Sequence, residues 1–335
     1  MKQVGIGLVG CGQFGESHLQ AYRAVAQATV AAVFDVDRKR AEQFAARFAI
    51  PTVCSSVDQL CALREVQMVD VVTPEAAHLE PVLRAFTHDK HVFVEKPLAT
   101  DMSHCDQMIA AAGESRRFFM VGHILRFETK YAMLKEETAS GRLGKIVSMR
   151  ARRNRPKEHL PLYGRVHLML ETCIHDIDLM LWYAGQPVRR VRGYTRNATG
   201  ATHPDTCWGV LEFAGGELGF VESAWLLPEK AGIVWDDAFQ LVGTGGVADL
   251  RLTPSSLTFW RDDGFQTPDV SYDPRVMNSA RGALRDELAY FCDCVMLNRP
   301  PEINSGIEAK RAVRVAQALI ESARSEQDVE IHDWD

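Results

Sequence analysis

The chain has 335 residues, with 46% hydrophobic and 24% charged side chains and a formal net charge of −6. A chain of this length exceeds one ordinary hydrophobic core, so we expect two domains. Its apolar stretches fall far below the roughly 20 residues that cross a bilayer, and no membrane helix is predicted. The acidic balance argues against a nucleic-acid partner, which requires a concentrated basic face.

Eight cysteines are scattered along the chain, and none forms a C-x-x-C pair. Cys292 and Cys294 stand too close in sequence for a zinc pair, so no metal site is predicted. Scattered cysteines in a large chain are typical of reduced thiols. We therefore expect a cytoplasmic protein.

Residues 1–121 alternate short β-rich runs with helical patterns, which is typical of βαβ units and a parallel, doubly wound sheet. The expected strands lie within 4–10, 29–35, 52–56, 68–74, 91–97 and 117–123. The expected helices lie within 15–26, 37–50, 77–89 and 101–115. This part of the chain is predicted to be a dinucleotide-binding α/β domain.

The pattern changes in residues 122–335, where longer strands predominate. After a helix at 129–141 and a strand at 145–154, strands are expected at 188–195, 207–214, 217–227, 238–246, 247–252 and 256–263. Further helices are expected at 171–185, 283–297 and 306–323. Strands that follow one another through short connections favour an open, mostly antiparallel sheet in an α+β domain. Such a sheet has a partly uncovered face, which makes self-association into a dimer or tetramer the expectation.

The segment Gly10-Cys11-Gly12-Gln13-Phe14-Gly15 directly follows an apolar strand and opens a helix. In such a turn the first glycine permits the tight bend, the second admits a pyrophosphate, and the third lets helix and strand pack closely. Asp35 ends the second strand 20 residues beyond Gly15, where an acid that binds a ribose is expected. This combination predicts a dinucleotide site.

Asp35 also bears on which dinucleotide binds. A carboxylate roughly 5 Å from a 2′-phosphate repels it by about 3 kcal/mol per unit charge at an effective dielectric near 20, which favours NAD. Arg38 is the residue that would compensate if the cofactor were NADP, although it also fits a solvated helix position.

Two further strand ends carry candidate residues. Thr73 and Pro74, with His78 shortly after, follow the fourth strand, where cofactors bind in such sheets. The fifth strand ends in Glu95, Lys96 and Pro97. Since proline fixes φ and lacks an N–H, it ends the strand and holds the lysine beside the expected cofactor.

In the predicted helix 171–185, Glu171 and His175 stand four residues apart, and His175 and Asp178 stand three apart. On a helix these three side chains share one face. A lone histidine on an apolar helix is more often a packed core residue, and two acids beside it make acid–base chemistry an equal alternative. A metal site is a weaker interpretation, because no second histidine stands at ligand spacing.

Together these motifs resemble the glucose–fructose oxidoreductase and inositol dehydrogenase (Gfo/Idh/MocA) family. The resemblance covers essentially the whole chain and rests on "GLVGCGQFGESHL", "VVTPEAAH", "VFVEKPLA", "IHDIDLMLW" and "SGIEAKRAVRVAQALIESA". It implies a Rossmann domain that binds NAD or NADP and a second domain that binds substrate and supports oligomers. The implied reaction is hydride transfer at a hydroxyl carbon of a sugar, inositol or related polyol.

The resemblance also implies roles for particular residues. Lys96 matches the family's E-K-P lysine and His175 its acid–base histidine, while Glu171 stands where many members have aspartate. Glu95 is expected to contact either the cofactor or the lysine. The residues expected to contact the substrate are Asn154, Tyr163, His167 and Asp178.

Three other functions remain open at this stage. Some relatives cleave glycosidic bonds through transient oxidation by tightly held NAD. A sugar-nucleotide 3-dehydrogenase would use a basic cluster to bind a diphosphate, and Arg150, Arg152, Arg153, Arg155 and Lys157 form such a cluster. The fold also serves in ligand-sensing regulators without catalysis, although the presence of both Lys96 and His175 favours an enzyme.

Overall fold

The computed structural model describes residues 3–228, 232, 235–262, 264–332 and 334. The chain folds into two compact units. The first unit comprises Met1–Phe127 and Tyr272–Lys310, and the second comprises Glu128–Ser271 and Arg311–Asp335. The expected functional boundary at residue 121 stays a prediction, as do the separate roles expected for residues 1–121 and 122–335.

The first unit contains a six-stranded parallel sheet with the strand order β3-β2-β1-β4-β5-β6. Its strands are β1 (Val4–Val9), β2 (Ala28–Phe34), β3 (Thr52–Val53), β4 (Met68–Val71), β5 (His91–Glu95) and β6 (Phe119–Gly122). They are nearly continuous apolar runs, as expected for strands that are covered on both faces. This sheet confirms the α/β Rossmann prediction.

Helices connect and cover these strands. They are α1 (Gln13–Arg23), α2 (Arg38–Phe48), α3 (Val57–Ala62), α4 (Leu79–Thr87), α5 (Met102–Ser115) and α10 (Ala283–Met296), with 3₁₀ turns η1 (Glu75–Ala77) and η2 (Ile124–Phe127). Side-chain caps begin several of them: Asp37 accepts from the Arg40 amide, and Asp101 from the His104 amide. These caps explain why the helices start at these residues.

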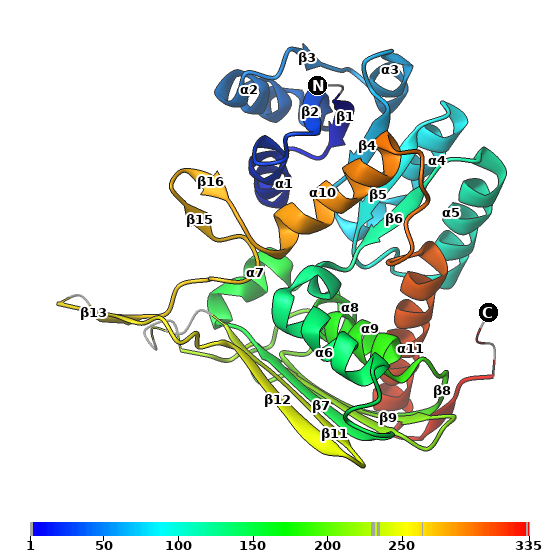
Figure 1. Cartoon of the computed structure of the whole chain (residues 1–335), viewed down its shortest axis with the longest axis vertical. Helices are drawn as coiled ribbons and strands as arrows, with labels where there is room; N and C mark the ends of the chain where they lie inside the picture. The colour runs from blue at the N-terminus through cyan, green and yellow to red at the C-terminus, as the bar shows by residue number, and fades with distance from the viewer. Residues whose placement is uncertain (1–2, 229–231, 233–234, 263, 333, 335) are drawn as a thin grey trace. The chain divides into compact units, whose positions relative to one another are not determined.

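Helix α10 comes from the late segment Tyr272–Lys310, yet it packs beside α1 in the first unit (Figure 1). Its Leu284, Leu288 and Phe291 are fully buried with Ile6 and Phe93 of the sheet. The same late segment contributes the short hairpin β15 (Arg275–Val276) and β16 (Ser279–Ala280). The core of the first unit is therefore closed by residues far along the chain.

The second unit contains a seven-stranded sheet with the order β12-β11-β7-β10-β9-β8-β17. Its strands are β7 (Ile146–Asn154), β8 (Val188–Arg196), β9 (Thr206–Phe213), β10 (Leu218–Ala224), β11 (Asp236–Gly243), β12 (Gly246–Thr253) and β17 (Val329–Glu330). Only β7 and β10 pair in parallel; the other neighbours are antiparallel. The predicted open, mostly antiparallel sheet is confirmed.

The helices assigned to the second unit include α6 (Thr129–Ala139), α7 (Leu160–Tyr163), α8 (Leu168–Glu171) and α9 (Cys173–Ala184), with the 3₁₀ turn η3 (Lys157–His159). Helix α11 (Gly306–Ser325) is divided between the units after Lys310. Figure 1 shows α6, α8 and α9 on one face of the sheet, and no described helix on the opposite face. That opposite face exposes Trp208 and Leu218, which alternate with buried residues along β9 and β10.

A separate two-stranded sheet pairs β13 (Phe259–Arg261) with β14 (Gly264–Gln266). Asp263, the last residue of the expected strand 256–263, lies outside the described residues. Across the described part of the chain, no helix is long and apolar enough to cross a membrane. All eight cysteines are buried and free of disulfides.

Candidate active site

The glycine turn between β1 and α1 has the geometry that its sequence predicts. Gly10 has φ of +109°, and a Cβ there would lie 2.6 Å from the Val72 carbonyl oxygen. A Cβ at Gly15 would lie 2.2 Å from the Gly10 carbonyl oxygen. Gly12, at the N-terminus of α1, has nothing within 4 Å of an added Cβ. Two glycines are thus required by packing, while the third leaves open space at the helix N-terminus.

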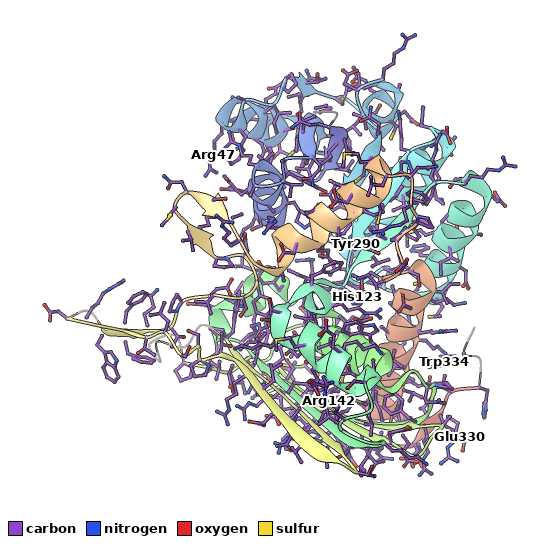
Figure 2. The ribbon with its side chains drawn as sticks, viewed as in Figure 1. Arg47, His123, Arg142, Tyr290, Glu330 and Trp334 are labelled. Carbon is purple, nitrogen blue, oxygen red and sulfur yellow. The ribbon has the colours of Figure 1, made fainter. Side chains whose placement is uncertain are left out.

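A cavity of about 480 Å³ lies beside this turn. It is lined by Cys11, Gly12, Gln13, Glu16, Arg40, Gln43, Phe44 and Arg47. Arg47, labelled in Figure 2, donates two hydrogen bonds of 2.8 Å to Glu16. Because helix N-termini attract anions, an open cavity at this end of α1 fits the phosphates of a dinucleotide.

Asp35 is held in one orientation at the end of β2. Its two carboxylate oxygens accept from the backbone amides of Cys11 at 2.8 Å and Asp37 at 2.9 Å. Arg40 Nη1 lies 3.7 Å from the Asp35 carboxylate, whereas Arg38 donates to Glu42 at 2.9 Å. The guanidinium near the expected ribose acid is therefore Arg40. Sequence reasoning missed it because three adjacent basic residues begin this helix.

His78 joins the loops that follow β4 and β5. Its Nε2 lies 3.0 Å from the Thr73 carbonyl oxygen, and its Nδ1 lies 3.1 Å from that of Pro97. Burial lowers the pKa of His78, although the neighbouring carbonyls oppose this effect. Pro74 immediately precedes η1 in the connection after β4. The ring is thus a buried tie between backbone segments, and its predicted contact with a cofactor stays a prediction.

The residues of the E-K-P motif stand at the carboxyl end of β5, the sheet edge where ligands bind in this type of fold. Lys96 is half-buried, and its peptide bond to Pro97 is cis. Glu95 is only 6% exposed, and its Oε2 accepts from the Lys96 amide at 3.1 Å. Its Oε1 lies 3.2 Å from Nε2 of His18, a residue that sequence reasoning did not select.

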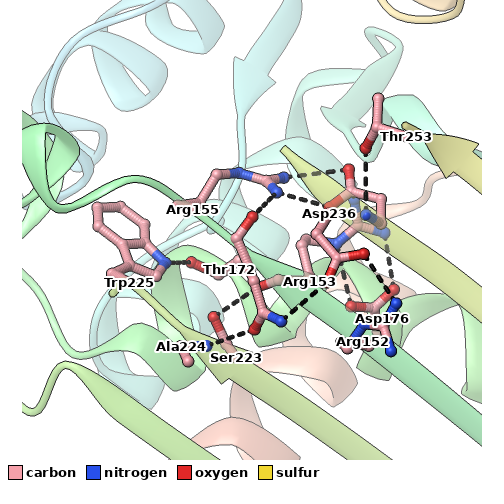
Figure 3. Close-up of polar contacts among 12 residues, drawn as sticks. Arg152, Arg153, Arg155, Thr172, Asp176, Ser223, Ala224, Trp225, Asp236 and Thr253 are labelled. Atoms are coloured by element: carbon pink, nitrogen blue, oxygen red, sulfur yellow. Dashed lines mark hydrogen bonds and ion pairs between the residues drawn. The ribbon is translucent and has the colours of Figure 1, made fainter. Parts of the chain in front are cut away.

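In the second unit, the helix expected at 171–185 is interrupted. Glu171 ends α8, and Cys173 begins α9, with Thr172 between them. The Thr172 hydroxyl accepts from Trp225 Nε1 at 3.0 Å, which ties the junction to the segment after β10 (Figure 3). The expectation of one continuous helix was wrong: Thr172, with φ of −111° and ψ of −52°, separates α8 from α9. His175, half-buried, and Asp178, fully buried, both belong to α9.

Two of the residues expected to contact substrate have structural partners within the second unit. Asn154 donates to Asp236 at 3.1 Å and accepts from the Ala224 amide at 2.8 Å, so both ends of its amide are engaged. His167 caps α8 by accepting from the Met169 amide at 3.1 Å. Burial, with a smaller contribution from His203, lowers the pKa of His167 to about 4.

Tyr163, at the end of α7, is partly buried. Burial raises the pKa of its hydroxyl, and the charge of Glu171 raises it further, whereas Arg165 lowers it. Tyr163 and Glu171 are thus close enough to interact electrostatically. Their expected roles in binding substrate or orienting the histidine stay predictions.

The arginines of β7 pair with carboxylates of their own unit (Figure 3). Arg153 donates to both oxygens of Asp176, at 3.0 and 2.7 Å, and to Asp237 at 2.9 Å. Arg155 also pairs with Asp237, and Arg152 pairs with Asp236. These acids pair with three of the five residues of the basic cluster, Arg152, Arg153 and Arg155, which weakens the case for a diphosphate ligand there.

Comparison with known proteins identifies the class to which the fold and the glycine turn belong. Residues 4–123 match an oxidoreductase family with an NAD-binding Rossmann fold, and residues 131–249 match the GFO/IDH/MocA C-terminal domain. An inositol 2-dehydrogenase from Saccharopolyspora erythraea is 32% identical over 84% of this chain and 83% of its own length. A myo-inositol 2-dehydrogenase from Thermotoga maritima is 25% identical over 98% of each chain.

The chain is an NAD-binding oxidoreductase. It belongs to the Gfo/Idh/MocA family. Among solved structures, scyllo-inositol dehydrogenase from Lactobacillus casei with bound NAD(H) and scyllo-inositol has a TM-score of 0.85 at 19% identity and covers 98% of this chain and 99% of its own. GenD2 from gentamicin A biosynthesis, in complex with NAD, has a TM-score of 0.86 at 23% identity, covering 99% and 97%. These likenesses show the shared fold.

Proposed function

We propose that this protein catalyses reversible hydride transfer between NAD and a hydroxyl carbon of a sugar, an inositol or a related polyol. One observation carries the proposal: three features follow strands of the same six-stranded sheet. They are the open glycine turn after β1, the hydrogen-bonded Asp35 carboxylate after β2, and Lys96 after β5. The name of the Saccharopolyspora relative, an inositol 2-dehydrogenase, supports a polyol substrate.

NAD binding is assigned to the first unit. The amides at the start of α1 face the pyrophosphate, and Gly12 leaves room for it. Asp35 accepts hydrogen bonds from the adenosine ribose, and its fixed negative charge favours NAD over NADP. Thr73, Pro74 and Glu95 are the proposed contacts near the nicotinamide end. When bound, the nicotinamide ring accepts or supplies the hydride.

The proton chemistry is assigned to Lys96 and His175. Lys96 donates a hydrogen bond to the substrate oxygen and stabilises its negative charge as the hydride leaves the carbon. His175 takes the hydroxyl proton, a task suited to a side chain that ordinarily titrates near neutral pH. Glu171 and Asp178 orient the imidazole or the substrate hydroxyls, and Tyr163 is the further proposed contact to substrate.

The exposed face of the seven-stranded sheet is proposed to mediate self-association. Trp208 and Leu218 give this face apolar area that a second copy would cover. Sedimentation of the purified protein distinguishes a monomer from a dimer or tetramer.

A screen for NADH formation tests the proposed reaction. Inositols, aldoses and their derivatives are each incubated with the enzyme and NAD, and absorbance of NADH is followed over multiple turnovers. We expect sustained NADH production with at least one polyol, and a rate at least about 100-fold lower with Lys96→Met. Cleavage of a glycoside without accumulation of NADH would favour the glycosidase alternative. Ligand binding without any turnover would favour a regulator.

A further inference from the structure

Three ionisable side chains meet inside the first unit beneath the E-K-P strand end. His18 Nδ1 lies 2.8 Å from Asp70 Oδ2, and His18 Nε2 lies 3.2 Å from Glu95 Oε1. His18 and Asp70 are fully buried. The three residues come from α1, β4 and β5, so the cluster joins a helix to two neighbouring strands. Nothing in the proposed reaction assigns a role to His18 or Asp70.

Both ring nitrogens of His18 lie near carboxylates: Nδ1 hydrogen-bonds to Asp70, whereas Nε2 is within ion-pair distance of Glu95 Oε1 without hydrogen-bond geometry. A neutral imidazole donates one hydrogen bond, whereas an imidazolium donates two. Burial, the largest single influence, lowers the pKa of His18, but Asp70 and Glu95 together raise it to about 10. The ring is therefore positively charged at neutral pH. Phe14 and Phe93 hold it edge-on, with ring centroids 5.0 and 5.8 Å away.

A second layer of polar groups surrounds these residues. Glu287 of α10 is fully buried, and its Oε1 accepts from Asn304 Nδ2 at 3.1 Å. Burial raises the pKa of Glu287, and repulsion from Glu95 raises it further. The negative charge of Asp70 contributes to the raised pKa of the Tyr22 hydroxyl and of the Cys292 thiol. Apolar packing alone would avoid such groups, because a buried charge is costly unless it is paired.

Through Glu95, the cluster contacts the backbone amide of Lys96. Glu95 presents one carboxylate oxygen to His18 and the other to the Lys96 amide, at 3.1 Å. Gly122 of β6 forms one wall of the space that Glu95 occupies, since a Cβ there would lie 2.5 Å from Glu95 Oε1. The position of this carboxylate therefore depends on both His18 and Gly122.

We propose that His18 is a positioning residue that fixes the Glu95 carboxylate and, through it, the orientation of Lys96. The proposal rests on the function proposed above for Lys96. Asp70 in turn holds the His18 ring from the opposite side. Helix α1 thus both presents its N-terminus to the cofactor phosphates and holds the strand end that carries the reacting lysine.

Two variants disturb this arrangement by different means. His18→Asn removes the bridging cation, and Gly122→Ala displaces the Glu95 carboxylate without changing an ionisable group. The matched controls are His104→Asn, a surface histidine that also contacts an aspartate, and Gly113→Ala, whose Cβ meets nothing within 4 Å. Each full-length variant is checked for folding by its melting temperature.

Two readouts separate positioning from stability. The first is steady-state kinetics with the best polyol from the screen, together with the Kd for NAD. The second is NMR titration of ¹³C-methylated lysines, with the Lys96 signal identified by its loss in Lys96→Met. We expect both variants to lower kcat at least about tenfold, since small misplacements of catalytic groups have effects of this size. The Lys96 titration shifts, and both controls resemble wild type. The Kd for NAD shows how much of the loss of kcat accompanies weaker cofactor binding, because Glu95 is also a proposed cofactor contact.

A folded His18→Asn protein with normal kcat and an unchanged Lys96 titration would overturn the proposal, as would a loss of melting temperature alone. If His18→Asn fails to fold, the same kinetic and NMR measurements on Gly122→Ala test whether the Glu95 carboxylate positions Lys96. If the wild type oxidises no polyol, the proposed function fails, but the Lys96 titration still shows whether His18 positions that side chain.

Discussion

Arg153 of β7 and Asp176 of α9 form a two-pronged ion pair inside the second unit, with N–O distances of 3.0 and 2.7 Å. Arg153 is 1% exposed and also donates to Asp237 at 2.9 Å. Asp176 immediately follows His175 in α9. The pair therefore ties the first turn of the helix that carries the proposed base to the central region of the sheet.

Replacement of Arg153 by Met is expected to lower the free energy of unfolding by about 3–5 kcal/mol, because it removes the ion-pair partner of the buried Asp176 carboxylate, whereas Asp237 keeps Arg155. Urea denaturation measures this loss. The matched control is Arg142→Ala, which removes an exposed pair with Glu137 at similar distances and should cost less than about 1 kcal/mol. Equal losses in the two variants would contradict the importance of burial.

The choice between NAD and NADP should depend on Arg40 and not on Arg38. Arg40→Ala is expected to lower kcat/KM with NADP about tenfold and to leave kcat/KM with NAD within about threefold, because only the extra phosphate needs this charge. Arg38→Ala is the control, since Arg38 pairs with Glu42. Steady-state kinetics with both cofactors tests the difference. A larger effect of Arg38→Ala would reverse the assignment.

His18 is expected to remain an imidazolium at pH 8. Its pKa is raised from 6.5 to about 10 in the folded protein, so the folded state holds a proton that the unfolded chain releases. The stability from this proton is fully present below pH 6.5 and is lost as pH rises through about 10, by up to about 1.4 kcal/mol per pH unit. Imidazole ¹⁵N NMR identifies the charge state. A ring that is neutral at pH 8 would contradict the two-carboxylate bridge.

Glu287→Gln is expected to stabilise the protein increasingly as pH rises above 4.5. Burial and nearby acids raise the pKa of Glu287 above its ordinary 4.5, so wild type must keep a proton that a glutamine does not need. The advantage grows by up to about 1.4 kcal/mol per pH unit until the folded-state pKa is reached. Urea denaturation at several pH values measures it. Glu42→Gln, at an exposed pair, serves as the control and should show no such trend.

The sequence predicts best what depends on local spacing. Residues 4–35 alone predict β1, the glycine turn and the expected ribose-binding acid Asp35, because these features lie close together in the sequence at characteristic spacings. Helix α10 was assigned by its periodicity, but its packing beside α1 depends on contacts between distant segments.

Two polar features that the sequence did not predict also depend on contacts between distant segments. His18, Asp70 and Glu95 belong to three different elements. They meet because β4 and β5 pair in parallel and His18 of α1 contacts both strands. The Thr172 hydroxyl at the helix junction likewise bonds to Trp225, 53 residues away. Spacing within one helix contains no signal for either.

The central claim is that Lys96 acts in hydride transfer and not merely in cofactor binding. Replacing Lys96 by Met and measuring kcat and the Kd for NAD separately tests it most directly, with exposed Lys145→Met as the control. We expect kcat to fall at least about 100-fold while the Kd for NAD changes by less than about threefold, because the lost charge stabilises the transition state. Near-normal kcat, or loss of NAD binding alone, would contradict the claim.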